Sequence, residues 1–126
     1  MANFKYTSWG NTRQPKNIIN SNHDTPASVT LAAGAATSAE YITENQRFLH
    51  ISHVVTTGDG NGEASIQLQI YSYATNVWVN FSSAIASRTD RRYQIVEIFG
   101  VDKVRFVATG LTGTEKCTIF PACSTF

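Results

Sequence analysis

Two histidines, His50 and His53, are the closest pair of residues in this chain with metal-binding or acid–base chemistry. They lie in an apolar run typical of a β-strand, where residues three apart point to opposite faces. A zinc-type site needs several ligands around one ion, and no Cys, Asp or Glu stands at ligand spacing beside them. We therefore interpret them as strand residues, one pointing inward and one outward.

A second candidate is the glycine-rich segment that contains Asp59, Asn61 and Glu63. Its oxygen ligands alternate as in part of a calcium-binding loop, but the full twelve-residue spacing with a terminal bidentate glutamate is missing. A hairpin turn explains the same residues without an ion. We favour the turn, and we predict no metal and no other cofactor.

Motifs for covalent or phosphate chemistry are missing from the chain. It has no Gly-x-Ser-x-Gly elbow, no Gly-x-Gly-x-x-Gly and no phosphate loop, and its nine acidic residues show no pairing. We expect this protein not to be an enzyme. A small hydrolase stays open as an alternative, and it would need a serine, a histidine and a carboxylate in one pocket.

Arg88, Arg91 and Arg92 form the one basic cluster, with Asp90 between them. Guanidinium groups at this spacing could contact carboxylates or phosphates of a partner. A solvated loop explains them as well, and we favour that interpretation.

Four aromatic residues could form an exposed patch: Tyr71, Tyr73, Trp78 and Tyr93. Such a patch would suit a subunit contact or, with coplanar rings on an open face, sugar stacking. Packing in the core is the commoner fate of such residues.

The two cysteines, Cys117 and Cys123, are too few for a disulfide framework or a structural zinc site. A turn at Pro121 would bring them within bridging distance, whereas a continuous strand would not. We favour two reduced, partly buried thiols over a disulfide.

The overall composition indicates one β-rich domain. Of 126 residues, 15% are charged and 42% hydrophobic, and the net charge is +1. Few lysines and glutamates leave little material for exposed helix faces, and the small net charge does not favour nucleic-acid binding. No apolar run is long enough to span a membrane, and the first residues lack a signal-peptide core. We expect synthesis in a cytoplasm, with no membrane and no nucleic acid as partner.

The clearest structural signal is the alternation over residues 63–83, which predicts a β-hairpin. We predict that its inner face is core: Ile66, Leu68, Ile70, Val77, Val79 and Phe81. Its outer face is uncharged and able to form hydrogen bonds, which makes it a candidate docking surface: Gln67, Gln69, Tyr71 and Trp78.

Further strand-like runs follow at spacings of 8 to 12 residues or so, which favours a sandwich or barrel. The runs cover residues 28–33, 39–43, 47–55, 92–100, 102–109 and 115–121. The run 47–55 is rich enough in apolar residues to favour burial on both faces. Residues 84–92 are interpreted as a polar connection. We predict an all-β fold, an antiparallel β-sandwich of jelly-roll type with about eight strands.

Residues 1–27 have no sustained period and are interpreted as an extended N-terminal arm before a domain at 28–126. The arm has more apolar side chains than a solvating tail needs, and it packs either on its own domain or on a neighbouring subunit. Its candidate contact residues are Phe4, Tyr6, Trp9, Ile18 and Ile19.

Three segments give the chain a resemblance to a known family. They are SVTLAAG at 28–34, SIQLQIYS at 65–72 leading into NVWVNF at 76–81, and DKVRFVATGLTG at 102–113. The style and order of these segments resemble those of the small β-sandwich virion structural proteins of tailed bacteriophages. The resemblance covers about residues 28–121. It departs from that pattern in its long, apolar arm.

This resemblance implies a non-enzymatic structural role, as a capsid decoration (cement) protein or a tail or fibre component. It implies the virion as location, the major capsid protein or other virion subunits as partners, and a homo-oligomer, with a trimer favoured. The family pattern has no catalytic positions, so no functional residue is carried over. The alternative is a carbohydrate-binding or host-adhesion module that uses exposed aromatic residues.

Overall fold

The computed structural model describes residues 28–56 and 58–124, and these form nine β-strands with no helix among them. The strands are β1 (Val29–Ala32), β2 (Tyr41–Ile42), β3 (Phe48–Thr56), β4 (Ala64–Ser72), β5 (Val77–Asn80), β6 (Ile85–Ser87), β7 (Arg92–Glu97), β8 (Lys103–Thr109) and β9 (Lys116–Ser124). No helix that could span a membrane occurs in these two ranges.

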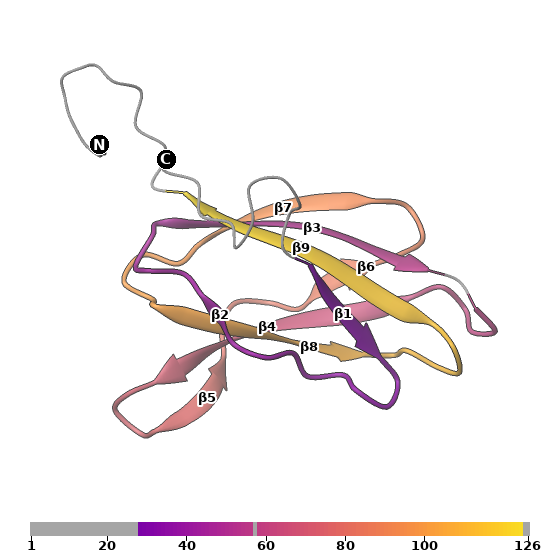
Figure 1. Ribbon diagram of the computed structural model, residues 1–126, viewed down its shortest axis with the longest axis horizontal. Helices are drawn as coiled ribbons and strands as arrows, with labels where there is room; N and C mark the ends of the chain where they lie inside the picture. The colour runs from indigo at the N-terminus through magenta and orange to yellow at the C-terminus, as the bar shows by residue number, and fades with distance from the viewer. Residues whose placement is uncertain (1–27, 57, 125–126) are drawn as a thin grey trace, which may run out of the picture.

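The strands form two antiparallel sheets that stack as the layers of a sandwich (Figure 1). The first sheet has the order β1-β9-β3-β7. The second has the order β2-β8-β4-β5, with β6 also paired to β4. With β5 left aside, β1-β9-β3-β7 faces β2-β8-β4-β6, which is a double-sheet jelly roll of eight strands. The predicted all-β sandwich of jelly-roll type is confirmed.

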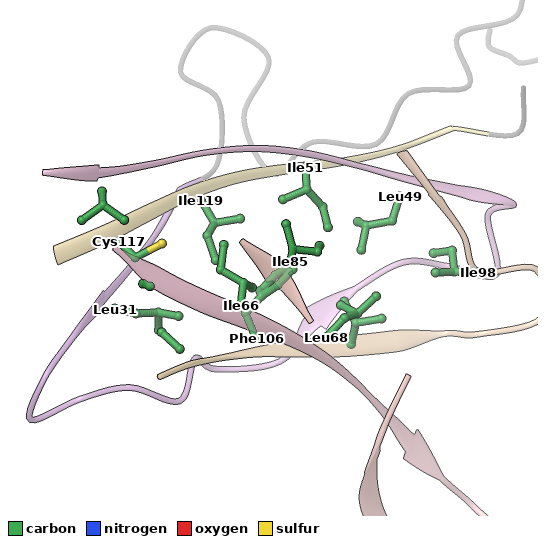
Figure 2. Packing of buried hydrophobic residues seen from close by; sticks show 14 of the residues in the cluster. Leu31, Leu49, Ile51, Ile66, Leu68, Ile85, Ile98, Phe106, Cys117 and Ile119 are labelled. Carbon is green, nitrogen blue, oxygen red and sulfur yellow. The ribbon is translucent and has the colours of Figure 1, made fainter. Parts of the chain in front are cut away.

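The hydrophobic core lies between the two sheets and receives every second side chain of the central strands. In β8, for example, Val104, Phe106 and Ala108 are buried and the residues between them lie on the outer face, as predicted. Figure 2 shows side chains of both sheets meeting between the layers. Each large apolar side chain that is fully buried here contributes about 1.5–3 kcal/mol to folding.

β6 is a strand that the sequence does not reveal, and the interpretation of residues 84–92 as a connection is wrong for its first half. Ile85 and Ser87 are buried, and Ile85 lies opposite Ile66 of β4. Three residues are too few to show a period, and a buried serine obscures the apolar pattern further.

The β4–β5 hairpin is present as predicted, with Tyr71 directly opposite Trp78. In its first strand Ile66 and Leu68 are fully buried, which confirms them as core residues.

The prediction that Val77 and Val79 belong to the core is wrong, since their exposed fractions are 51% and 37%. Ile70 and Phe81 pack against the core but are only partly buried. Figure 1 shows the β5 end of the hairpin bending away from the first sheet. The alternation therefore continues into a part of the hairpin that no second layer covers.

β3 is buried on one face only, which contradicts the expectation of burial on both. Leu49, Ile51, His53 and Val55 point inward, whereas the residues between them are half-buried on the outer face.

β9 continues through Pro121 to Ser124, three residues beyond the predicted run, so the chain has no turn at Pro121 that would bring the two cysteines together. Pro121 lies opposite Ile51 of β3 and past the end of β1. Proline has no backbone N–H to donate, and at this position no residue of β1 needs that hydrogen bond. Cys117 and Cys123 are both free, as predicted, and they are fully buried rather than partly. Burial raises the pKa of the Cys123 thiol to about 12 and also raises the pKa of Cys117.

Candidate functional site

The outer face of the second sheet brings together polar, aromatic and basic side chains from β4, β5 and β8. Tyr71 pairs with Trp78, and Gln69 pairs with Arg105. Directly opposite residues of antiparallel strands project from the same face of a sheet. We call the group formed by these residues and their contacts the aromatic face: Gln69, Tyr71, Tyr73, Trp78, Lys103 and Arg105.

The three rings of the aromatic face meet edge to face. The centroids of Tyr71 and Trp78 lie 5.4 Å apart with 74° between the ring planes, and those of Tyr71 and Tyr73 lie 5.0 Å apart at the same angle. Such T-shaped pairs are worth about 0.5–1.5 kcal/mol beyond the area that they bury. The rings are not coplanar, so they do not form the flat platform that sugar stacking would use.

Two cations cover ring faces in this group. The Lys103 Nζ lies 4.6 Å from the centre of the Tyr71 ring, and the Arg105 guanidinium carbon lies 4.7 Å from the centre of the Trp78 ring. Cations over aromatic faces are attracted by about 0.5–1 kcal/mol at exposed sites. Arg105 Nε also donates to Gln69 Oε1 at 2.7 Å, which fixes the guanidinium above Trp78.

The two cations differ in their charge partners. Lys103 Nζ lies 3.5 Å from a carboxylate oxygen of Glu40. No carboxylate in the described part of the chain forms an ion pair with Arg105. At the rim of the face, the Tyr73 hydroxyl donates to Asp102 Oδ2 at 2.8 Å, and this hydrogen bond raises the pKa of Tyr73. The arrangement presents an arginine beside aromatic rings and suits a partner that offers a carboxylate next to apolar groups.

Lys103 and Arg105 were not among the residues that the sequence singled out. Their alternation with buried residues places them on an outer face, but only the pairing of β8 with β4 shows that this is the face of Tyr71 and Trp78. Strand order is not encoded in periodicity, so no local signal would have found them.

Gln67 lies on the same side of β4 but serves the fold. Its Nε2 donates to the backbone oxygens of Leu68, Phe81 and Ser82 at 3.0–3.3 Å. These bonds attach the chain that follows β5 to β4 and use the amide N–H donors of Gln67 within the fold.

The arginine cluster is divided among three partners. Arg88 pairs with Glu63 at 2.7 Å, and Arg92 pairs with Asp90 at 3.1 Å. Arg91 donates to Ser52 Oγ at 3.4 Å on the first sheet. These residues form separate contacts rather than one basic patch.

Tyr93 is separated from the other three aromatic residues because it lies on β7 of the first sheet. Its hydroxyl forms a hydrogen bond of 2.7 Å with His50 Nδ1, and His50 Nε2 is 2.7 Å from Ser124 Oγ. His50 therefore points outward, as predicted.

His53 points inward, also as predicted, and takes part in a buried polar cluster that the sequence did not indicate. Its Nδ1 lies 2.8 Å from Ser87 Oγ, to which the Cys117 thiol donates at 3.8 Å. Ser87 lines an open depression of about 250 Å³ but is only 1% exposed. Burial, and secondarily the charge of Arg92, lower the pKa of His53. We interpret the cluster as a neutral contact between the sheets.

The oxygen atoms of the glycine-rich loop are used in contacts within the chain. Asp59 Oδ1 accepts from the Thr114 N–H at 2.9 Å, Asn61 Oδ1 accepts from the Glu63 N–H at 3.3 Å, and Glu63 pairs with Arg88. No group of three or more His, Cys, Asp or Glu side chains within 28–56 and 58–124 is arranged to hold a metal ion.

The arm residues Phe4, Tyr6, Trp9, Ile18 and Ile19 lie outside the described residues. Comparison of this chain with known protein families, curated proteins and solved structures gave no match.

Proposed function

We propose that this chain is a non-enzymatic structural protein that docks onto a larger protein assembly through the aromatic face. The observation that supports this is the convergence of Tyr71, Trp78 and Arg105 on one open sheet face. Tyrosine, tryptophan and arginine are the residues that most often dominate the binding energy of protein interfaces. They lie outside the core, so the fold does not require them there.

The specific form of the proposal follows from the sequence resemblance to phage virion proteins. In that form the chain is a capsid decoration protein, located in the virion, whose partner is the major capsid protein. The aromatic face would contact a carboxylate flanked by apolar side chains on the shell, because Arg105 has a planar charged group and no carboxylate partner in the described residues.

Protein docking is favoured over sugar binding by the contacts of the rings. Lys103 and Arg105 each cover one face of a ring, and the rings stand at 74° to one another. A sugar needs an open ring face, whereas a protein partner can use the ring edges and the guanidinium together.

The test measures binding of the purified full-length chain to empty shells assembled from the major capsid protein of the same virus. Trp78→Lys and Arg105→Glu should each weaken binding by about tenfold or more, because they remove central contacts. Thr30→Lys, on the outer face of β1, is the matched control and should bind like the original chain.

Circular dichroism and melting of each variant would show that the fold is retained, since neither residue is part of the core. Equal shell binding by all the variants would refute a role for the aromatic face. Binding to a glycan array that depends on Trp78, without shell binding, would instead support the carbohydrate-binding alternative.

A further inference from the structure

β7 is the longest edge strand in the described residues. It has six residues, whereas β1 and β5 have four, β6 has three and β2 has two. β7 pairs with β3 on one side, and no other described strand lies on its second side. Proteins usually protect such edges with short strands, prolines or charged side chains, and β7 contains no proline or lysine and has its charged residues, Arg92 and Glu97, only at its two ends.

The backbone groups on the open side of β7 can be assigned from one hydrogen bond. The Ile98 N–H donates to the Arg47 carbonyl at 2.7 Å, so Ile98 directs its backbone toward β3. Backbone direction alternates along an antiparallel strand. Tyr93, Ile95 and Glu97 therefore direct their N–H and C=O groups to the open edge.

The side chains of the same residues lie on the outer face and are unusually apolar for an edge. Tyr93 is 63% exposed and Ile95 is 55% exposed. Arg91 lies just before them and contacts Ser52 on this face, and Glu97 lies at the other end of the strand. The edge thus has a positive end, two apolar side chains and a negative end, where the exposed Glu97 also pairs with Arg47 at 3.0 Å.

We propose that β7 pairs antiparallel with β7 of a second copy of this chain, about a twofold axis that passes through Gln94. In this register Arg91 faces Glu97 of the second copy, and Tyr93 faces Ile95 of the second copy. Each contact occurs twice. Arg91, which has no carboxylate partner among the described residues, gains one. The two four-stranded first sheets become one continuous sheet.

The inner side of the β7 edge has room for the added strand. An open depression of about 460 Å³ lies there between β7 and the segment 81–84, and Gln94 and Val96 line it. In the proposed register the two Gln94 side chains lie next to each other on this side, where their amides can form a hydrogen bond. The twofold dimer differs from the trimer that the sequence resemblance implies, so the mass in solution separates the two.

The first experiment is sedimentation equilibrium of the full-length chain, with an expected mass of twice 13.8 kDa. Arg91→Glu and Glu97→Arg each place like charges opposite one another and should weaken dimerisation about tenfold or more. The double variant restores opposite charges and should restore the dimer. Arg88→Glu, a charge reversal just after β6, is the matched control and should leave the dimer intact.

The second experiment uses amide hydrogen exchange with and without Ile95→Pro, which removes one outward N–H without removing a bond to β3. In the original chain the amides of Tyr93, Ile95 and Glu97 should exchange slowly, and in the dissociated variants they should exchange fast.

A monomer or a trimer at micromolar concentration would overturn the proposal. The proposal would also be overturned if the single charge reversals had the same mass in solution as the dimer of the original chain. These residues lie off the aromatic face, so shell binding is measured independently.

Discussion

Glu115 joins two loops with its carboxylate, although the sequence places it only at the start of the last strand. The side chain is fully buried and accepts hydrogen bonds from the backbone N–H of Gly62 and of Thr112. These two bonds lower the pKa of Glu115. A Cβ at Gly60 would clash with the buried Glu115 carboxylate and with the Thr112 hydroxyl, so the close approach of the loops favours glycine there.

The sign of the pH effect follows from the lowered pKa. The stabilisation by Glu115 is complete above its ordinary pKa of 4.5 and is lost as the pH falls through the lower value of the folded state. Asp59 acts in the same direction, because the Thr114 N–H lowers its pKa as well. Acid should therefore weaken the contact between the two loops as the pH falls below about 4.5.

We predict that Glu115→Gln lowers the melting temperature at pH 7 and flattens the decline of stability below pH 4.5. Glutamine keeps one acceptor oxygen but places an NH₂ group against a backbone N–H. Melting curves between about pH 3 and 7, a range that brackets the carboxylates, check this. Glu63→Gln, an exposed neighbour, is the control. An unchanged pH profile in Glu115→Gln would show that the loop contact does not stabilise the fold.

At the scale of the element, the β4–β5 hairpin shows how far periodicity can be used. Alternation identified both strands and the face to which each side chain belongs. It did not show that the sandwich ends partway along β4, so Leu68 is fully buried whereas Val77 is 51% exposed. Apolar residues in the same alternating pattern therefore contribute more to the free energy of unfolding at the buried end of the hairpin than at its exposed end.

We predict that Leu68→Ala destabilises the protein by about 2–5 kcal/mol, because it leaves a cavity between the sheets. Val77→Ala, in the same hairpin, should change stability by less than about 0.5 kcal/mol. Urea unfolding of both variants checks the contrast. Similar losses for both would mean that Val77 is covered in solution, for instance by a partner or by residues outside the described ranges.

At the scale of the whole molecule, the two sheets are joined by the apolar core and by polar contacts that include a buried cluster. His53 of β3 and Cys117 of β9 belong to the first sheet, and Ser87 of β6 belongs to the second. Because burial lowers the pKa of His53, folding favours its neutral form. The cluster couples the contact between the layers to pH.

We predict that the stability of the original chain is fully present above pH 6.5, the ordinary pKa of histidine, and declines as the pH falls below it. The carboxylates Glu115 and Asp59 act only below about 4.5, so the interval between the two values reports His53. His53→Gln should remove the decline in that interval. Chemical denaturation at pH 7 and pH 5.5 or so measures it. An equal decline in His53→Gln would assign the effect to another group.

By itself, the amino-acid sequence determined the fold class, the hairpin, most strands and, in β4 and β8, the side of the strand that faces the core. These features depend on local alternation, which a chain shows residue by residue. The sequence predicted about eight strands, which included β5 but not β6, and the described residues form nine. β6 is short and contains a buried serine, so only its pairing with β4 identifies it.

Only the tertiary structure decided which outer faces come together. The pairing of β8 with β4 places Arg105 over Trp78, and the position of β7 at the end of its sheet leaves Tyr93 and Ile95 exposed. Both facts depend on strand order, which is fixed by contacts between residues far apart in the chain. The arrangement of the candidate docking face and of the open edge therefore became visible only when the two sheets were assembled.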